Sequence, residues 1–315
     1  MRKIVFLPLA MSSVSLAVLG ALSSCTTQSD DLPLSSGTAV GGAAADAMLN
    51  KAKAYESAGK TSKAISTYGN IAKKYPNANS AAEARYSEGR LLDKQGDLFK
   101  SFEAYQELIT RYPSSKHYAQ ALKRQESVAH AAANGIIKNN FLGMKTSISP
   151  EKTSKMLGHV RDNAPRALSA SKAQFAIGQV WQKEGIAEKA IPAFQRIGAD
   201  YPNSKESPEA LYLTGEILIL KAERGNQNKA NVNRAKSIFQ DLVQRYPSHS
   251  RAADARKRLS MLGGQDLQRS YDTAEFYRKK GQPKSALFYY REVLRKTKSG
   301  PLHNQAKQRI TELGG

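Results

Sequence analysis

Residues 174–202 read QFAIGQVWQKEGIAEKAIPAFQRIGADYP, and this stretch decides the fold. Ala190, Phe194 and Ile197 are spaced by four and then three residues, which puts them on one face of a helix. Gly185 separates this segment from an earlier helical one. The closing Tyr201-Pro202 ends the second helix, because proline has no N–H to donate and disfavours the α conformation of the residue before it. The stretch therefore predicts two helices joined by a glycine turn.

The same pattern recurs along the chain. Tyr-Pro closures stand at residues 75–76, 112–113, 201–202 and 246–247, and a degraded unit ends at 164–165. Before each Tyr-Pro closure an aromatic residue follows an Ala or Ser by four, and an aliphatic residue follows three later. With a terminal unit that lacks the Tyr-Pro closure, the sequence predicts six helix pairs. The aromatic residues expected in the core are Tyr68, Tyr105, Trp181, Phe194, Phe239 and Tyr290.

Small residues at the helix crossing, glycine at the turn and proline at the end resemble the tetratricopeptide repeat (TPR). The predicted fold is all-α, a TPR helical-hairpin solenoid preceded by a cleaved lipoprotein signal peptide and a flexible linker. The expected divisions are the signal peptide (1–24), the lipidated cysteine and linker (25–45), N-terminal TPR units (46–135), middle units with a spacer and an insertion (136–263), and a C-terminal unit (264–315). The insertion after Arg224 is interpreted as a lengthened turn.

The N-terminus predicts export and a lipid anchor. Arg2 and Lys3 precede an apolar stretch, and Leu22-Ser23-Ser24-Cys25 resembles the lipobox of bacterial lipoproteins. An uncleaved membrane-spanning anchor is the alternative. A cysteine after small residues, followed by a polar segment, favours cleavage and lipidation of Cys25. Thr26 in place of the aspartate that retains lipoproteins in the inner membrane favours the outer membrane.

Composition limits the function. The formal net charge of +21 suits nucleic acid, anionic lipid or acidic protein surfaces, but export argues against nucleic acid. The five histidines are scattered without metal-ligand spacing, and neither a phosphate-binding loop nor a nucleophile motif is present. We therefore expect no catalytic residue, no metal and no cofactor, and a protein that is not an enzyme.

Long-period units with Tyr-Pro closures on a lipoprotein resemble the outer-membrane assembly lipoproteins of the BamD (YfiO) type. The resemblance covers residues 46–313, and residues 174–202 and 271–294 carry it most clearly. It implies a scaffold on the periplasmic face of the outer membrane, whose partners are a barrel-forming insertase and unfolded outer-membrane proteins. The chain departs from the family in its more basic composition and in the insertion after Arg224.

The first helices of the units are expected to line a peptide-binding groove. The candidates for this groove are Leu49, Lys53, Glu56, Glu83, Tyr86, Arg90 and Asp93. By analogy with the family, the candidates for docking the insertase are Tyr271, Glu275 and Arg278. Two alternatives stay open: a periplasmic coordinator of cell envelope and division of the CpoB (YbgF) type, and a TPR lipoprotein that binds an anionic envelope polymer.

Overall fold

The computed structural model describes residues 39–135, 140–141, 144–145, 148–225 and 228–315. The expected signal peptide, Cys25 and the first part of the expected linker lie outside the described residues. The described residues form an array of helices with one pair of two-residue strands, which confirms the all-α prediction. The elements are α1 (Ala39–Ser57), α2 (Thr61–Lys74), α3 (Asn79–Gln95), α4 (Leu98–Arg111), α5 (Tyr118–Ala133), β1 (Asn140–Phe141), β2 (Met144–Lys145), α6 (Pro150–Asn163), α7 (Leu168–Lys183), α8 (Ala187–Asp200), α9 (Glu206–Arg224), α10 (Lys229–Arg245), α11 (Ser250–Lys279), α12 (Pro283–Lys296) and α13 (Pro301–Glu312).

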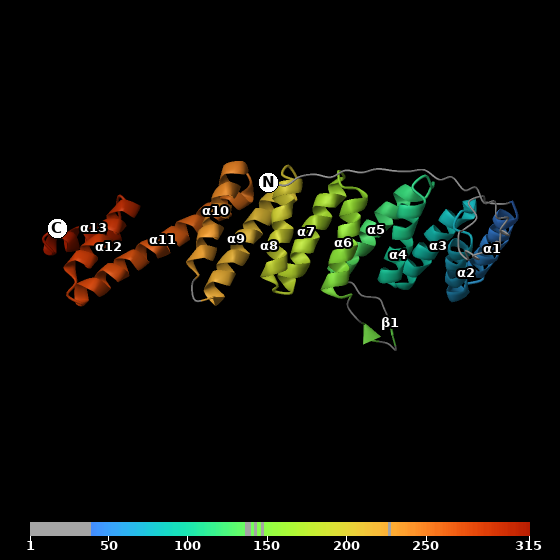
Figure 1. Cartoon of the computed structure of the whole chain (residues 1–315), viewed down its shortest axis with the longest axis horizontal. Coiled ribbons are helices and arrows are strands. Elements are labelled where there is room, and N and C mark those ends of the chain that lie inside the picture. Colours follow the sequence, from blue (N-terminus) through green and yellow to red (C-terminus); the bar gives the residue numbers. More distant parts are fainter. Residues whose placement is uncertain (1–38, 136–139, 142–143, 146–147, 226–227) are drawn as a thin grey trace, which may run out of the picture.

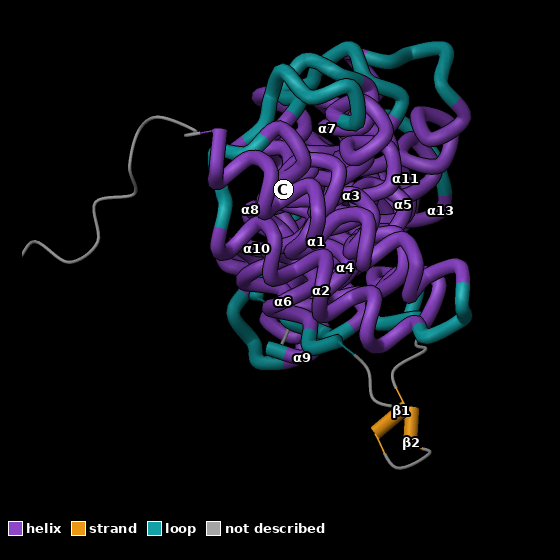
Figure 2. The backbone as a smooth tube through the Cα atoms, turned by 90° about the vertical axis from the view of Figure 1, so that its right-hand side faces the viewer, coloured by secondary structure: helices purple, strands orange, loops and turns teal. Residues whose placement is uncertain are grey.

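Consecutive helices pair, and the pairs stack in one elongated row (Figure 1). The pairs run from α1–α2 to α11–α12, and α13 packs against the last of them. The first helices of successive units also touch, as α1 touches α3 and α5 touches α7. The antiparallel strands β1 and β2 project from the row between α5 and α6 (Figure 2). This arrangement is the predicted TPR solenoid.

The linker is shorter than the sequence suggested. Helix α1 begins at Ala39, and Ala45 is fully buried in a cluster with Ala52 and Tyr68. The end of the expected tether, residues 39–45, is therefore helical. Alanine is the best helix former, and its small side chain lets α1 lie close to its neighbours.

Where a unit has glycine at its helix crossing, that glycine lies against one aromatic ring of the second helix. A Cβ added at Gly178 would lie 2.4 Å from the ring of Phe194, and one at Gly215 would lie 2.4 Å from that of Phe239. Both rings are at most 1 % exposed. All six aromatic residues predicted for the core are buried. The spacing read from the sequence therefore reflects a direct contact between the two helices of a unit.

The Tyr-Pro closures do more than end helices. The hydroxyl of Tyr112 donates a hydrogen bond to the carbonyl of Pro76 in the preceding closure, at 2.8 Å. The hydroxyl of Tyr246 donates in the same way to the carbonyl of Pro202, at 2.5 Å. In these two units the closure tyrosine thus ties its unit to the unit before it. Proline leaves its carbonyl available for this contact, since only its N–H is missing.

The insertion after Arg224 is only partly a longer turn. Helix α7 ends five residues after its crossing glycine, Gly178, whereas α9 ends nine residues after Gly215. Helix α10 also begins earlier relative to its core aromatic than α8 does. The added residues therefore lengthen both helices by about one turn each. The side chain of Asn228 caps α10 by accepting a hydrogen bond from the N–H of Ala230 at 2.9 Å.

Helix α11 is the main departure from a regular solenoid. The crossing residue follows the preceding closure proline by 13 residues in the units of Gly89, Gly178 and Gly215, but Ala274 follows Pro247 by 27. Fourteen more helical residues add about 21 Å along the helix axis. The expected boundary between residues 263 and 264 consequently falls inside one continuous helix.

The lengthened helix separates two hydrophobic cores. The first half of α11 contributes Ala255 and Leu262 to the large central core. The second half contributes Ala274 to a separate C-terminal core that includes Tyr290 and Ile310. The C-terminal unit therefore has a core of its own, joined to the rest of the solenoid along α11 (Figure 1).

Candidate protein-binding surfaces

The predicted groove residues lie on a surface formed by α1, α3 and α5, which we call the first-helix face. Lys53 of α1 and Glu83 of α3 form an ion pair with 2.6 Å between Nζ and Oε1. Lys116, just before α5, lies 4.0 Å from the other oxygen of Glu83. The hydrogen bond from Lys53 is the main reason that the pKa of Glu83 is lowered. These residues connect three successive units.

A second connection crosses from the first unit to the second. Glu56 of α1 forms an ion pair with Arg90 of α3 and accepts a hydrogen bond from the hydroxyl of Tyr68 at 3.0 Å. Partial burial acts to raise the pKa of Glu56, but the hydrogen bonds from Arg90 and Tyr68 outweigh it and the pKa is lowered. The same environment raises the pKa of Tyr68 to about 12, chiefly through burial and the bond to Glu56.

The remaining predicted groove residues, Tyr86 and Asp93, also contact the neighbouring unit. The ring of Tyr86 stacks on that of His117, with centroids 4.6 Å apart and planes 7° apart. Asp93 lies 3.9 Å from Arg124 of α5. The structure therefore brings six of the seven predicted residues onto one face, where each contacts a residue of a neighbouring unit.

Leu49 is the exception, and its prediction as a groove residue is wrong. It is 8 % exposed and belongs to the core cluster with Ala45, Ala52 and Ile71. Its position three residues before Ala52 turns it toward α2 and α3 rather than toward solvent.

The predicted docking residues form one cluster in the C-terminal unit. Glu275 accepts hydrogen bonds from the hydroxyl of Tyr290 and from Nη2 of Arg278, the latter at 2.7 Å. Nε of Arg309 in α13 lies 3.3 Å from the same carboxylate. The ring of Tyr271 meets that of Tyr290 edge-on, with centroids 5.7 Å apart. Burial acts to raise the pKa of Glu275, but its partners lower it to about 2. This cluster holds α11, α12 and α13 together.

The same unit exposes aromatic rings that the sequence analysis missed. Phe276 is 54 % exposed and Phe288 is 65 % exposed. Phe276 meets Tyr277 edge-on, Tyr277 stacks on Tyr289 with centroids 5.5 Å apart, and Tyr289 meets Phe288 edge-on. We call Phe276, Tyr277, Phe288 and Tyr289 the aromatic patch. The sequence could have indicated this exposure. Phe276 is two residues after the core residue Ala274, and Phe288 is two residues before the core residue Tyr290, so each lies on the opposite side of its helix from the core.

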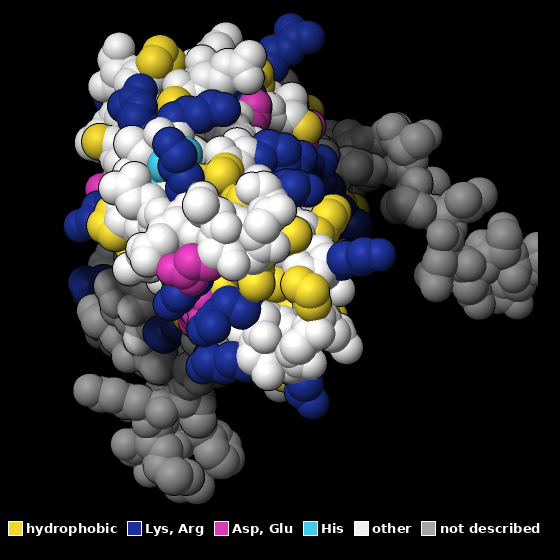
Figure 3. All heavy atoms as spheres, turned by 90° about the vertical axis from the view of Figure 1, so that its left-hand side faces the viewer, with side chains coloured by type: hydrophobic (Ala, Val, Ile, Leu, Met, Phe, Trp, Pro, Cys, Tyr) yellow, Lys and Arg dark blue, Asp and Glu magenta, His cyan; other side chains and the backbone are white. Residues whose placement is uncertain are grey.

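Cations lie beside the aromatic patch. Lys279, Lys280 and Lys284 lie at the turn between α11 and α12, and none forms an ion pair within the described part of the chain. The Lys280 ammonium is 5.5 Å from the centroid of the Phe276 ring. Figure 3 shows the end of the molecule that carries the C-terminal unit, where Lys and Arg outnumber Asp and Glu and apolar side chains lie between them. An aromatic surface next to cations that form no ion pair in the described part of the chain suits an acidic partner.

Two kinds of site are absent from the described residues. No group of three or more His, Cys, Asp or Glu side chains among them could hold a metal ion. None of their helices has the length and apolar character needed to cross a bilayer.

Family models account for most of the solenoid. The model of the outer membrane lipoprotein YfiO matches residues 149–311, just over half of the chain. The chain belongs to the YfiO family of outer membrane lipoproteins. The match runs from the start of α6 to the end of α13 and so contains the C-terminal cluster and the aromatic patch. TPR models match residues 46–78 and 83–115, the first two units of this YfiO-family protein.

Curated relatives carry the name outer membrane protein assembly factor BamD. The protein from Neisseria gonorrhoeae is 28 % identical over 131 residues, which is 37 % of this chain and 48 % of the relative. The one from Caulobacter vibrioides is 26 % identical over 124 residues, 39 % of this chain and 41 % of the relative. The chain thus spans about half the length of the curated relatives it matches.

Solved structures of TPR proteins are more distant. MamA from Desulfovibrio magneticus RS-1 is 16 % identical, covers 65 % of this YfiO-family chain and 97 % of its own, and has a TM-score of 0.30. The P58(IPK) TPR domain is 16 % identical, covers 85 % and 78 % of the two chains, and has a TM-score of 0.35.

Proposed function

We propose that this YfiO-family protein is a BamD-like scaffold of the machinery that assembles β-barrel outer-membrane proteins. Cys25 carries the lipid that holds it on the periplasmic face of the outer membrane, and no catalytic chemistry takes place on it. Its partners are the barrel insertase and unfolded outer-membrane proteins. The family match and the BamD relatives support this role.

The observation that carries the proposal furthest is the aromatic patch, because it lies within the family match and is open to a partner. Exposed aromatic side chains beside cations are the groups that dominate stable protein interfaces. The predicted docking residues Tyr271, Glu275 and Arg278 have a supporting part in this proposal. Their internal bonds fix α11, α12 and α13 relative to one another and so hold the patch in shape.

Capture from crosslinked outer membranes tests the proposal. The lipidated wild-type chain is compared with Phe276→Ser/Phe288→Ser, which removes the two exposed rings without touching a core side chain. Leu168→Ser in α7 is the control, since Leu168 is 80 % exposed and lies far along the row from the patch. We expect the wild type and the control to recover a barrel insertase and the patch variant to lose most of it.

Other results would redirect the assignment. Recovery of division or peptidoglycan proteins without an insertase would contradict the assembly role and favour an envelope coordinator. Equal insertase recovery by all three proteins would keep the assembly role but remove the aromatic patch from it. Thermal melting of the patch variant checks that a loss of capture does not come from unfolding.

A further inference from the structure

The loops that follow the second helix of each unit lie along one edge of the row, which we call the closure edge. They comprise residues 75–78, 112–117, 164–167, 201–205, 246–249 and 297–300. Since consecutive helices run in opposite directions, these loops share one side. Figure 1 shows them along the upper side of the row, while β1 projects from the lower side. The loops inside the units form the opposite edge, and the view along the row separates the two edges (Figure 2).

The closure edge carries charge of one sign. Its loops contain neither Asp nor Glu but four cationic residues, which are Lys116, Arg166, Lys205 and Lys298. Five of the six second helices also have Lys or Arg in their last turn, and α8 is the exception. The loops inside the units differ, because they include Asp97 and Glu184 as well as lysines. Positive charge is therefore concentrated on the closure edge.

The carboxylates near the closure edge do not cancel this charge. Asp162, Asp200 and Glu209 each lie within 2.8 Å of an arginine nitrogen and are neutralised inside the chain. Among the described residues, Lys116 is the one loop cation with a carboxylate within 4.0 Å, and the other three loop cations are exposed without an ion pair. A single exposed lysine is ordinarily just solvated. A line of cations along one edge creates a positive potential that reaches about 8 Å into solvent at physiological ionic strength.

The chain enters the fold at the same edge. Helix α1 is the first helix of its unit, so its start at Ala39 lies on the side of the closure loops. Cys25, the residue expected to carry the lipid, precedes Ala39 by 14 residues. A chain of that length reaches at most about 50 Å when fully extended. A lipid anchor at Cys25 therefore attaches the row to the membrane from its closure side.

We propose that the closure edge lies on the anionic headgroups of the phospholipid leaflet that holds the anchor, with the row lengthwise along the membrane. Each Lys or Arg held near such a surface strengthens binding about fivefold. The loop cations are spread from Lys116 to Lys298, which favours the lengthwise orientation. Helix α11 ends on the opposite edge, so the aromatic patch stays open to a protein partner. This inference rests on the proposed function in one respect, the lipid at Cys25.

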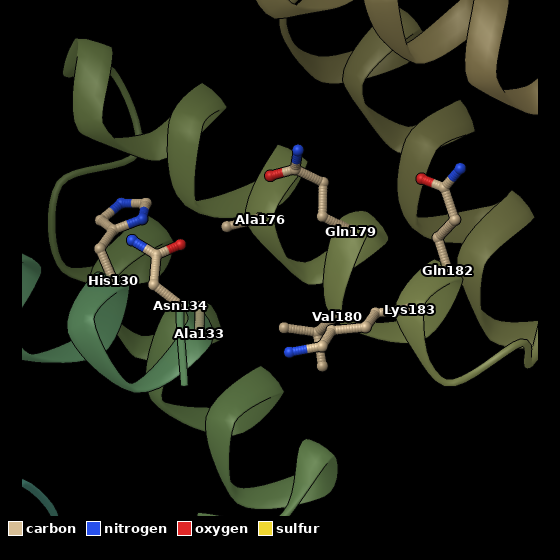
Figure 4. Close-up of a pocket in the computed structure, with 8 residues that line it drawn as sticks. All are labelled: His130, Ala133, Asn134, Ala176, Gln179, Val180, Gln182 and Lys183. Carbon is tan, nitrogen blue, oxygen red and sulfur yellow. The ribbon is translucent and has the colours of Figure 1, made fainter. Parts of the chain in front are cut away.

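The test removes the three loop cations that form no ion pair among the described residues. Arg166→Gln/Lys205→Gln/Lys298→Gln lowers the net charge by three and leaves the core untouched. The matched control, Lys60→Gln/Lys183→Gln/Lys229→Gln, removes three exposed lysines from the opposite edge. Lys183 ends α7 there and borders a hollow of about 440 Å³ between α5 and α7 (Figure 4). Thermal melting establishes that both variants fold.

Binding is measured by co-sedimentation with vesicles, using the mature chain from Thr26 without its lipid. The hydrophobic cores of the described residues lie within residues 45–310, so this chain folds without the anchor. The vesicles contain phosphatidylcholine alone or with about one third phosphatidylglycerol. We expect the wild type to bind only the anionic vesicles and to be released by salt. The control should bind nearly as well, and the closure-edge variant at least tenfold more weakly.

Three results would overturn the inference. These are no sedimentation of the wild type with anionic vesicles, equal binding to neutral vesicles, or equal losses in the two variants, which would make overall charge rather than one edge responsible. Binding to peptidoglycan sacculi, lost in the closure-edge variant while vesicles are ignored, would assign the edge to an envelope polymer instead.

Insertase capture by the lipidated chain is measured separately from vesicle binding. A chain that binds anionic vesicles through the closure edge but captures no insertase would refute the proposed function alone. A chain that captures the insertase but ignores the vesicles would refute this inference alone.

Discussion

The crossing glycines give the sharpest test of how the solenoid is packed. Gly178→Ala adds one methyl group at the point where α7 and α8 cross. The added carbon would lie 2.4–2.8 Å from three atoms of the Phe194 ring. Phe194 is 1 % exposed and has no free space to enter. The ring or the helix must therefore move by about 1 Å to restore ordinary van der Waals contact.

Two opposing effects set the magnitude. Overpacking a well-packed core costs about 1–3 kcal/mol, and a clash with an immobile ring belongs at the upper end. Replacing glycine by alanine inside a helix returns about 1 kcal/mol through propensity. We expect Gly178→Ala to lower the free energy of unfolding by about 2 kcal/mol. Gly158→Ala in α6 is the control, since nothing lies within 4 Å of its added carbon. It should raise the same free energy by about 0.5–1 kcal/mol.

The assay is urea unfolding followed by helical circular dichroism, with Gly178→Ala, Gly158→Ala and the wild type measured side by side. Repeat arrays can unfold in more than one step, so the transition of the central units is compared rather than a global midpoint. Equal shifts for the two variants, or a Gly178→Ala protein as stable as the wild type, would refute the idea that glycine is present to admit the ring.

The other predictions concern contacts between helices. Hydrogen-bond and ion-pair partners lower the pKa of Glu275 to about 2, below its ordinary value of 4.5. The contribution of Glu275 to stability is therefore complete above about pH 4.5 and is lost as the pH falls toward 2. Between pH 6 and pH 3, the urea midpoint of Glu275→Gln should change less than that of the wild type. Tyr112→Phe removes the hydrogen bond to Pro76 and should cost about 0.5–1.5 kcal/mol in the N-terminal unfolding transition, and an unchanged transition would mean that this bond contributes nothing. Arg90→Ala breaks the partly exposed pair with Glu56 and should cost about 0.2–1 kcal/mol at low salt and less in 1 M salt, so a cost independent of salt would contradict an ionic origin.

The repeated pattern was enough to predict the helix pairs and their core. Ala190, Phe194 and Ile197 fall on one helix face by spacing alone, and all three are buried. The turn glycines were also predicted from the sequence. Gly185 and Gly281 adopt positive φ angles of 72° and 68°, which glycine accepts without strain. These features depend on residues within a few turns of one another, and a short window of sequence contains all of them.

Contacts between units could not be read in the same way. The sequence placed Glu56 and Arg90 on a shared surface but did not show that they neutralise each other, because 34 residues separate them. It did not reveal that Leu49 points into the core or that the Tyr112 hydroxyl reaches the preceding closure. Each of these depends on the rotation of one helix pair against the next, which packing of the whole array decides.

The C-terminal half shows which features local sequence predicts and which depend on the tertiary structure. The sequence by itself predicted that the C-terminal unit, expected at residues 264–315, forms a helical hairpin with Tyr290 in its core, since the amphipathic period is local. Only the tertiary structure decided that Ser250–Lys279 is one continuous helix and that the aromatic patch stays uncovered at its far end. Whether a side chain is covered, paired or left open depends on which distant helix lies against it, and local periodicity carries no record of that neighbour.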